Sequence, residues 1–150
     1  TAFLASIVGE NGRVFGFDIQ ERAIFNTTKK LKDLNLSGRV TLIKDGHQNM
    51  DKYVDSPVKA VMFNLGYLPS GDHDLGTRPE TTIDALSKSM ELLITGGIIT
   101  VVIYYGGDSG FEEKEKVLEF LKSIDQKRFI VQHTDFINQA NCPAILVCIE

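Results

Sequence analysis

The sequence has little of what marks secreted, membrane-spanning or strongly basic proteins. It contains two cysteines in 150 residues. It has no apolar run of about 18 residues, the length that a membrane span needs. Its 16 Lys and Arg are outnumbered by 20 Asp and Glu, which gives a formal charge of −4. These shortages argue against a disulfide framework, a membrane span or signal peptide, and a protein that coats nucleic acid by charge alone.

The two cysteines are not expected to pair. Cys142 and Cys148 are six positions apart in the expected last strand, so they would lie about 20 Å from each other. A disulfide needs Cα atoms within about 7 Å. Free thiols fit a reducing compartment, and we expect a cytoplasmic protein with no membrane contact.

The chain reads as one domain, residues 1–150, because 43% of its residues are hydrophobic and no linker, repeat or low-complexity segment interrupts it. It begins at Thr1 rather than Met. Residues 2–8 resemble the end of a helix that Gly9 closes. We therefore expect a natural segment upstream.

Apolar periodicity predicts alternating strands and helices. The expected strands are residues 13–18, 39–44, 58–63, 98–104, 128–134 and 144–149. The expected helices are residues 21–34, 79–94 (stopped by Gly96 and Gly97) and a segment around Val117, Phe120, Leu121 and Ile124, with a short helical segment at 48–53. This alternation implies an α/β fold with a mostly parallel sheet, and the last two strands, with no helix between them, imply an edge hairpin and one antiparallel strand. That is the layout of the class I methyltransferase (Rossmann-like) sheet.

Three expected strands end in a polar residue: Asp18, Asp45 and Asn64. Ligands bind at the carboxyl ends of strands in such sheets. Asp18, followed by Ile19 and Gln20, is placed to accept both hydroxyls of an adenosine ribose, although an aspartate here could instead be the N-cap of the next helix.

Asp45 is followed by Gly46 and His47. Its carboxylate could accept from an adenine amino group, and Gly46 would allow close backbone approach. An ordinary Asp-Gly turn is the alternative, and His47 is more typical of a packed or capping residue than of a catalyst. The three strand ends together favour a nucleoside site.

Several longer motifs carry a resemblance to a known family. They are residues 17–20 (Phe-Asp-Ile-Gln), 45–47 (Asp-Gly-His), 63–69 (Phe-Asn-Leu-Gly-Tyr-Leu-Pro), 78–82 (Arg-Pro-Glu-Thr-Thr), 125–127 (Asp-Gln-Lys) and 136–139 (Phe-Ile-Asn-Gln). Together they resemble the MnmM (YtqB-type, rRNA methylase-like) methyltransferases over essentially the whole chain. The resemblance implies an enzyme that uses S-adenosylmethionine to methylate the 5-aminomethyl group of a modified wobble uridine, in the anticodon region of bacterial tRNA.

The chain departs from the family pattern at its start. The family opens with a strand and a glycine-rich turn that passes under the methionine part of the cofactor, and Thr1 comes just after them. The resemblance thus implies that the first strand and its turn are missing from this chain. Tyr105, where relatives often carry His, could alter substrate contacts, whereas Ala144 in place of a second Pro puts little in doubt.

Residues 64–67, which follow the third expected strand, would bind the amine of the substrate. The side-chain oxygen of Asn64 and the backbone carbonyls of Leu65 and Gly66 can accept the amine's hydrogens and aim its lone pair at the methyl carbon. Tyr67 could stack on the uracil ring or pack in the core.

Further residues are candidates for substrate contact. An alkylamine must lose a proton before attack, and Asp72, His73 and Asp74 could receive it, unless they form a solvated loop. Arg78 could touch a tRNA phosphate or neutralise neighbouring acids, and Tyr104 and Tyr105 could line the pocket or pack.

Other functions are also consistent with the sequence. The acceptor could be rRNA or a small amine, and a non-catalytic nucleoside- or RNA-binding module would also explain the strand ends. An NAD-dependent dehydrogenase would suit Asp18 but not the Asn-Leu-Gly-Tyr turn. No metal is expected, and a homodimer is left open.

Overall fold

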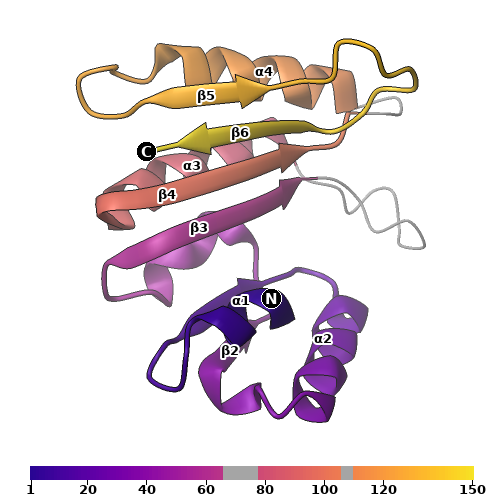
Figure 1. Cartoon of the computed structure of the whole chain (residues 1–150), viewed down its shortest axis with the longest axis vertical. Coiled ribbons are helices and arrows are strands. Elements are labelled where there is room, and N and C mark those ends of the chain that lie inside the picture. The colour runs from indigo at the N-terminus through magenta and orange to yellow at the C-terminus, as the bar shows by residue number, and fades with distance from the viewer. Residues whose placement is uncertain (66–77, 106–109) are drawn as a thin grey trace. The chain divides into compact units, whose positions relative to one another are not determined.

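The computed structural model describes residues 1–65, 78–105 and 110–150 of the chain. Helices and strands alternate along it as the periodicity predicts (Figure 1). In chain order the elements are α1 (Ala2–Ile7), β1 (Val14–Phe17), α2 (Glu21–Asp33), η1 (Ser37–Arg39), β2 (Val40–Ile43), η2 (His47–Lys52), β3 (Val58–Leu65), α3 (Pro79–Leu92), β4 (Leu93–Ile103), α4 (Gly110–Ser123), β5 (Val131–Thr134) and β6 (Ile145–Ile149).

The described chain forms two compact units, which we call unit 1 (Thr1–Val54) and unit 2 (Asp55–Glu150). Unit 1 contains the parallel pair β1-β2, and unit 2 contains a four-stranded sheet of order β3-β4-β6-β5. β3 and β4 are parallel, whereas β6 is antiparallel to both of its neighbours. The predicted α/β class with one antiparallel C-terminal strand is confirmed. The predicted hairpin also forms, with β6 inside the sheet and β5 at its edge.

Unit 1 packs its helices and its two strands around a small apolar core. The buried core residues are Ala5 from α1, Val14 from β1 and Leu31 from α2. Leu31 continues the helical spacing of apolar residues that predicts α2, because residues three and four apart share one face of a helix. Arg39 ties the end of η1 to α1 by donating from its guanidinium to the carbonyl of Ala5 at 3.2 Å.

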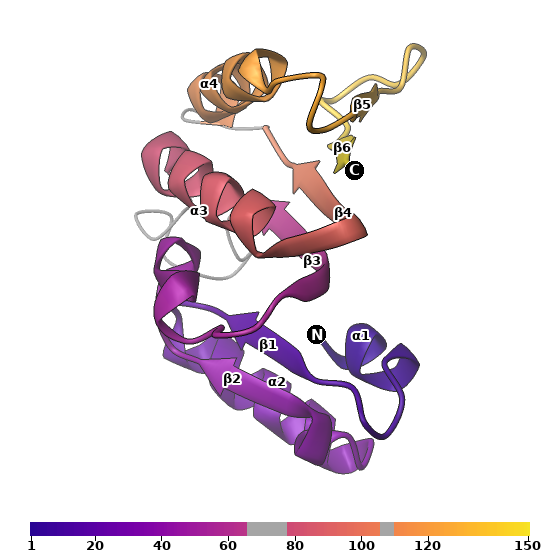
Figure 2. The same ribbon diagram turned by 90° about the vertical axis from the view of Figure 1, so that its left-hand side faces the viewer.

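In unit 2, one face of the sheet is buried and the two helices cover it. Successive side chains on a strand point to opposite faces, so every second residue faces the helices. The residues that do so are Phe63 and Leu65 of β3, Ile99, Val101 and Ile103 of β4, and Ile145, Val147 and Ile149 of β6. Figure 2 shows α3 and α4 on the same side of this sheet. Each such side chain contributes roughly 1.5–3 kcal/mol when it is fully buried.

The junction of α3 and β4 differs from the prediction. α3 ends at Leu92, and β4 begins at Leu93, before the two glycines that were expected to stop the helix. The ladder pairs Val58 with Leu93 but Ala60 with Ile98, so β4 carries extra residues here. Gly96 takes the left-handed φ of +74° that this irregularity requires. The apolar spacing of Leu92, Leu93 and Ile94 looks helical, but pairing with β3 decides the boundary.

Candidate functional site

In unit 1, the predicted cofactor residues follow β1 and β2 at one edge of the ladder. The two strands pair in register, with Phe17 beside Ile43. The Asp18 N–H donates to the Ile43 carbonyl at 3.1 Å, so the pairing extends one residue past β1. Parallel strands end at the same edge, which is why Asp18 and Asp45 both emerge there.

Asp18 closes a turn with its own side chain. Its Oδ1 accepts the backbone N–H of Gln20 at 2.9 Å. Gln20, with extended φ and ψ, is the N-cap residue of α2, and its carbonyl accepts from Ala23 and Ile24. Asp18 therefore precedes the helix and is not its N-cap. Ile19, next to it, exposes its apolar side chain.

Asp45 accepts three hydrogen bonds. Its Oδ1 accepts from the Gly46 N–H at 2.7 Å and from Asn49 Nδ2 at 2.9 Å, and its Oδ2 accepts from the Tyr53 hydroxyl at 2.8 Å. These bonds, that of Asn49 first, lower the pKa of Asp45 below its usual value. The carboxylate is thus held ionised as an acceptor, with a lone pair of Oδ2 remaining.

Asn49 and Tyr53 were not predicted as site residues. They lie four and eight positions after Asp45, and this spacing is the signal that could have found them. The Tyr53 ring also meets the Phe17 ring edge-on, with centroids 5.9 Å apart and planes at 65°. Tyr53 thereby connects the residues that follow β2 to the end of β1.

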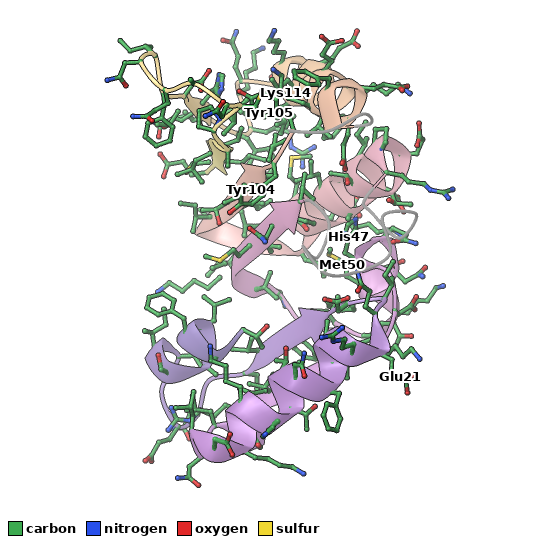
Figure 3. All side chains as sticks on the ribbon, turned by 90° about the vertical axis from the view of Figure 1, so that its right-hand side faces the viewer. Glu21, His47, Met50, Tyr104, Tyr105 and Lys114 are labelled. Carbon is green, nitrogen blue, oxygen red and sulfur yellow. The ribbon has the colours of Figure 1, made fainter. Side chains whose placement is uncertain are left out.

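Gly46 is buried and His47 is partly buried. Gly46 has an ordinary φ of −69°, and a Cβ added there would meet the side-chain amide of Gln48. The Gly46 backbone was expected to allow a ligand to approach closely. The side chain of Gln48 occupies that position. Burial lowers the pKa of His47, so its ring is neutral at pH 7. His47 lies on η2 with the buried Met50 (Figure 3), which supports packing over catalysis.

In unit 2, Asn64 lies near the carboxyl end of β3. Its side chain is exposed, between the buried Phe63 and Leu65. The Leu65 carbonyl accepts the backbone N–H of Tyr104 at 3.2 Å, so it completes the ladder with β4 and has one lone pair left. Asn64 is therefore better placed than Leu65 to accept hydrogen bonds from a ligand.

Other predicted residues of this stretch cannot be placed. Gly66, Tyr67, Asp72, His73 and Asp74 lie outside the described residues. Their roles remain predictions.

The two tyrosines that follow β4 face different surroundings. Tyr104 is 53% exposed, whereas Tyr105 is buried. The Tyr105 ring meets Phe111 edge-on at 5.6 Å, and Lys114 Nζ lies 4.1 Å from its centroid (Figure 3). Burial, with smaller effects of Asp135 and Cys142, raises the pKa of Tyr105, so its hydroxyl keeps its proton at neutral pH. Of these two tyrosines, Tyr104 is the one that presents its ring to solvent.

Arg78 is exposed at the start of α3, where it is the N-cap residue and Pro79 occupies the first turn. Its carbonyl accepts from the Thr82 N–H at 3.0 Å and from the Thr81 hydroxyl at 2.9 Å. These bonds fix the backbone of Arg78 at the amino end of α3, and its side chain is exposed.

Within the described residues, no three His, Cys, Asp or Glu side chains gather as metal ligands would. In the same part of the chain, no helix is long and apolar enough to cross a membrane. Cys142 and Cys148 are free thiols, as predicted.

The class I S-adenosylmethionine-dependent methyltransferase fold is defined by two features. One is the sheet of unit 2, with its last strand antiparallel between β4 and β5. The other is a polar residue at or near the carboxyl end of each of β1, β2 and β3. Comparisons with known proteins identify the family. The family described as "Putative rRNA methylase" matches residues 14–150, and the chain belongs to it.

Two of the solved structures that are similar to the chain belong to bacterial methylases or methyltransferases. A Clostridium thermocellum protein described as a "putative rRNA-methylase" is 86% identical with a TM-score of 0.97, and the match covers 99% of this chain and 80% of that one. A Streptococcus mutans protein, described as a "putative methyltransferase" and solved in complex with SAH, is 45% identical with a TM-score of 0.85. That match covers 91% of this chain and 74% of the other.

A sequence relative has a more specific description. The chloroplastic tRNA (mnm(5)s(2)U34)-methyltransferase of Arabidopsis thaliana is 33% identical over 145 residues, which are 93% of this chain and 53% of the relative. The chain thus spans about half the length of that protein. The predicted family, the methyltransferase class and S-adenosylmethionine as the family's cofactor are confirmed.

Proposed function

We propose that the protein containing this chain methylates the amino nitrogen of a 5-aminomethyl group on the wobble uridine of bacterial tRNA, with S-adenosylmethionine as donor. The observation that carries the proposal is the exposed Asn64 side chain near the carboxyl end of β3. The Arabidopsis relative, described as acting on U34 of tRNA, supports the choice of substrate.

The residues of unit 1 suit an adenosine. Bound S-adenosylmethionine would supply an electrophilic methyl carbon, and its ribose and adenine offer hydroxyl and amino donors. Asp18 and Asp45 provide carboxylate acceptors, and Ile19 provides exposed apolar surface. We assign Asp18, Ile19 and Gln20 to the ribose side, and Asp45, Gly46 and His47 to the adenine side.

The residues of unit 2 suit a neutral amine. The Asn64 amide oxygen can accept an N–H of the amine, which aims the nitrogen lone pair. Tyr104 offers an exposed ring beside β4 for a base, and Arg78 offers a cation for a phosphate. We assign the stacking of the uracil to Tyr67, further acceptor carbonyls to Leu65 and Gly66, and removal of the amine proton to Asp72, His73 or Asp74.

A second acceptor, rRNA, follows from the description of the matching family. It requires the same chemistry with a different docking surface. Substrate competition separates the two.

The test uses the full-length protein. Calorimetry first measures the binding of S-adenosylmethionine, and the protein is then incubated with tRNA that lacks the final methyl group, with rRNA, or with a small alkylamine. We expect methylated aminomethyl-uridine only in the tRNA digest, detected by mass spectrometry of nucleosides. A protein that binds the cofactor yet leaves this tRNA unmethylated would show that the proposed substrate is wrong.

A further inference from the structure

The connection between β5 and β6, residues 135–144, exposes apolar side chains that the fold does not use. Ile137 is 102% exposed and Phe136 is 57% exposed. Asn138 and Gln139, which follow them, are exposed as well. Two adjacent large apolar side chains on the surface cost solvation without adding to a core, so a binding role would explain them.

The connection lies at the edge of the sheet where β3 and β4 end. β6 runs antiparallel to β4, and Ile145, its first residue, pairs with Ile103, the last residue of β4. Figure 1 shows the β5–β6 connection at the same edge as the arrowheads of β3 and β4. The effect of Asp135 and Cys142 on the pKa of Tyr105 agrees with this placement. The exposed side chains thus belong to the same sheet edge as Asn64.

The composition of the connection favours nucleobases over phosphates. Residues 135–144 contain no Lys or Arg, and Asp135 is acidic, so the segment cannot neutralise a phosphate backbone. Phe136 and Ile137 can cover the flat faces of unstacked bases, and the amides of Asn138 and Gln139 can both donate to and accept from base edges. Stacking of unpaired bases on aromatic rings, with hydrogen bonds to the base edges, recurs where proteins bind single-stranded RNA.

The backbone of the connection has a defined shape. Asn141 and Cys142 both have left-handed φ angles, +67° and +51°, which residues other than glycine adopt at a cost. At its other end, Asp135 Oδ1 accepts the N–H of Phe136 at 2.7 Å. A segment held in this way presents its exposed side chains with little further ordering on binding.

We propose that the β5–β6 connection binds unpaired bases beside the target uridine in the substrate RNA loop. Phe136 and Ile137 contact the faces of these bases, and Asn138 and Gln139 contact their edges. This inference rests on the proposed function, because it presupposes an RNA substrate.

The test compares the exposed residues of the connection with exposed apolar residues elsewhere in the chain. Phe136→Ala and Ile137→Ser, singly and together, are made in the full-length protein. Phe25→Ala on α2 and Ile130→Ser, before β5 at the opposite end of the sheet, are matched controls because they are 68% and 59% exposed. Binding of an anticodon stem-loop is measured by fluorescence anisotropy with SAH present, and KM and kcat are measured with tRNA.

We expect Phe136→Ala to weaken stem-loop binding and to raise KM about tenfold, as loss of one base stacked on an aromatic ring does. Ile137→Ser should change both quantities in the same direction, because it removes apolar contact with a base. We expect kcat and SAH affinity to stay unchanged, and both controls to match the wild type. Unchanged stem-loop affinity would overturn the inference, as would a change in oligomeric state with KM unaltered. Because anisotropy needs no methyl transfer, a protein that binds the RNA without methylating it would contradict the proposed function and not this inference.

Discussion

At the scale of single residues, Asp45 shows how one carboxylate is fixed for a binding role. Asn49, Tyr53 and the Gly46 N–H donate to it, so the side chain is both oriented and kept ionised. A protonated carboxyl would lose part of this set, because one of its oxygens would become a donor. These contacts should therefore make the free energy of unfolding depend on pH.

The first prediction concerns Asp45 and acid. The pKa of Asp45 in the folded protein lies below the ordinary value of 3.8. Its contribution to the free energy of unfolding is then present above that value, and it is lost as pH falls through that value and the lower folded pKa. We expect Asp45→Asn to make urea unfolding less dependent on pH in this window. Exposed Asp55→Asn is the control, and equal pH dependence of the wild type and Asp45→Asn would contradict the prediction.

The second prediction concerns two glycines in open surroundings. An added Cβ would meet nothing within 4 Å at Gly96 or at Gly38, but only Gly96 has a left-handed φ, of +74°. We expect Gly96→Ala to lower the free energy of unfolding by about 1–2 kcal/mol through backbone strain. Gly38→Ala should be neutral or stabilising. Equal effects in urea unfolding would show that the irregularity in β4 does not depend on the glycine.

At the scale of elements, a buried polar contact joins the amino-terminal turns of α3 and α4. The Thr82 hydroxyl donates to Glu113 Oε1 at 3.1 Å, and both residues are buried. Lys116 adds exposed ion pairs to Glu80 and Glu112, at 3.4 and 2.8 Å. Because α3 and α4 follow β3 and β4 in the chain, this contact should help to hold the sheet edge that carries Asn64.

The third prediction separates the buried contact from the exposed ones. Thr82→Val keeps the side-chain volume but removes a donor from a buried carboxylate, which should cost about 1–3 kcal/mol of unfolding free energy. Lys116→Met should cost less, and its effect should vanish at high salt because exposed ion pairs are screened. Thermal unfolding at low and high salt gives both values. A smaller loss for Thr82→Val than for Lys116→Met would contradict the assignment.

The elements also show why local patterns predict some boundaries and not others. The almost wholly apolar, β-branched run from Ile98 to Ile103 predicts the carboxyl-terminal part of β4 correctly, because a short run of such residues is a local signal for a strand. The end of α3 was predicted wrongly because Leu93 and Ile94 prolong a helical pattern. Their backbone belongs to β4, and that follows from pairing with β3, which no local window contains.

At the scale of the whole molecule, the sequence predicts the fold class and the strand ends that carry polar residues. Asp18, Asp45 and Asn64 all lie where the alternation of elements places them. Contacts between distant residues were beyond such reasoning. Thr82 and Glu113 are 31 positions apart, and only the packing of α3 on α4 joins them. The position of β6 between β4 and β5 is likewise a matter of topology, which the order of elements along the chain leaves open.

The measurement that tests the central claim most directly is the single-turnover rate of methyl transfer to tRNA by full-length Asn64→Ala. If Asn64 aims the amine, we expect the rate to fall about a hundredfold at saturating tRNA, as loss of a positioning contact can do. The unfolding free energy should stay close to the wild type because the side chain is exposed. A rate equal to that of the wild type would contradict the assignment of the methyl-transfer site to the carboxyl end of β3.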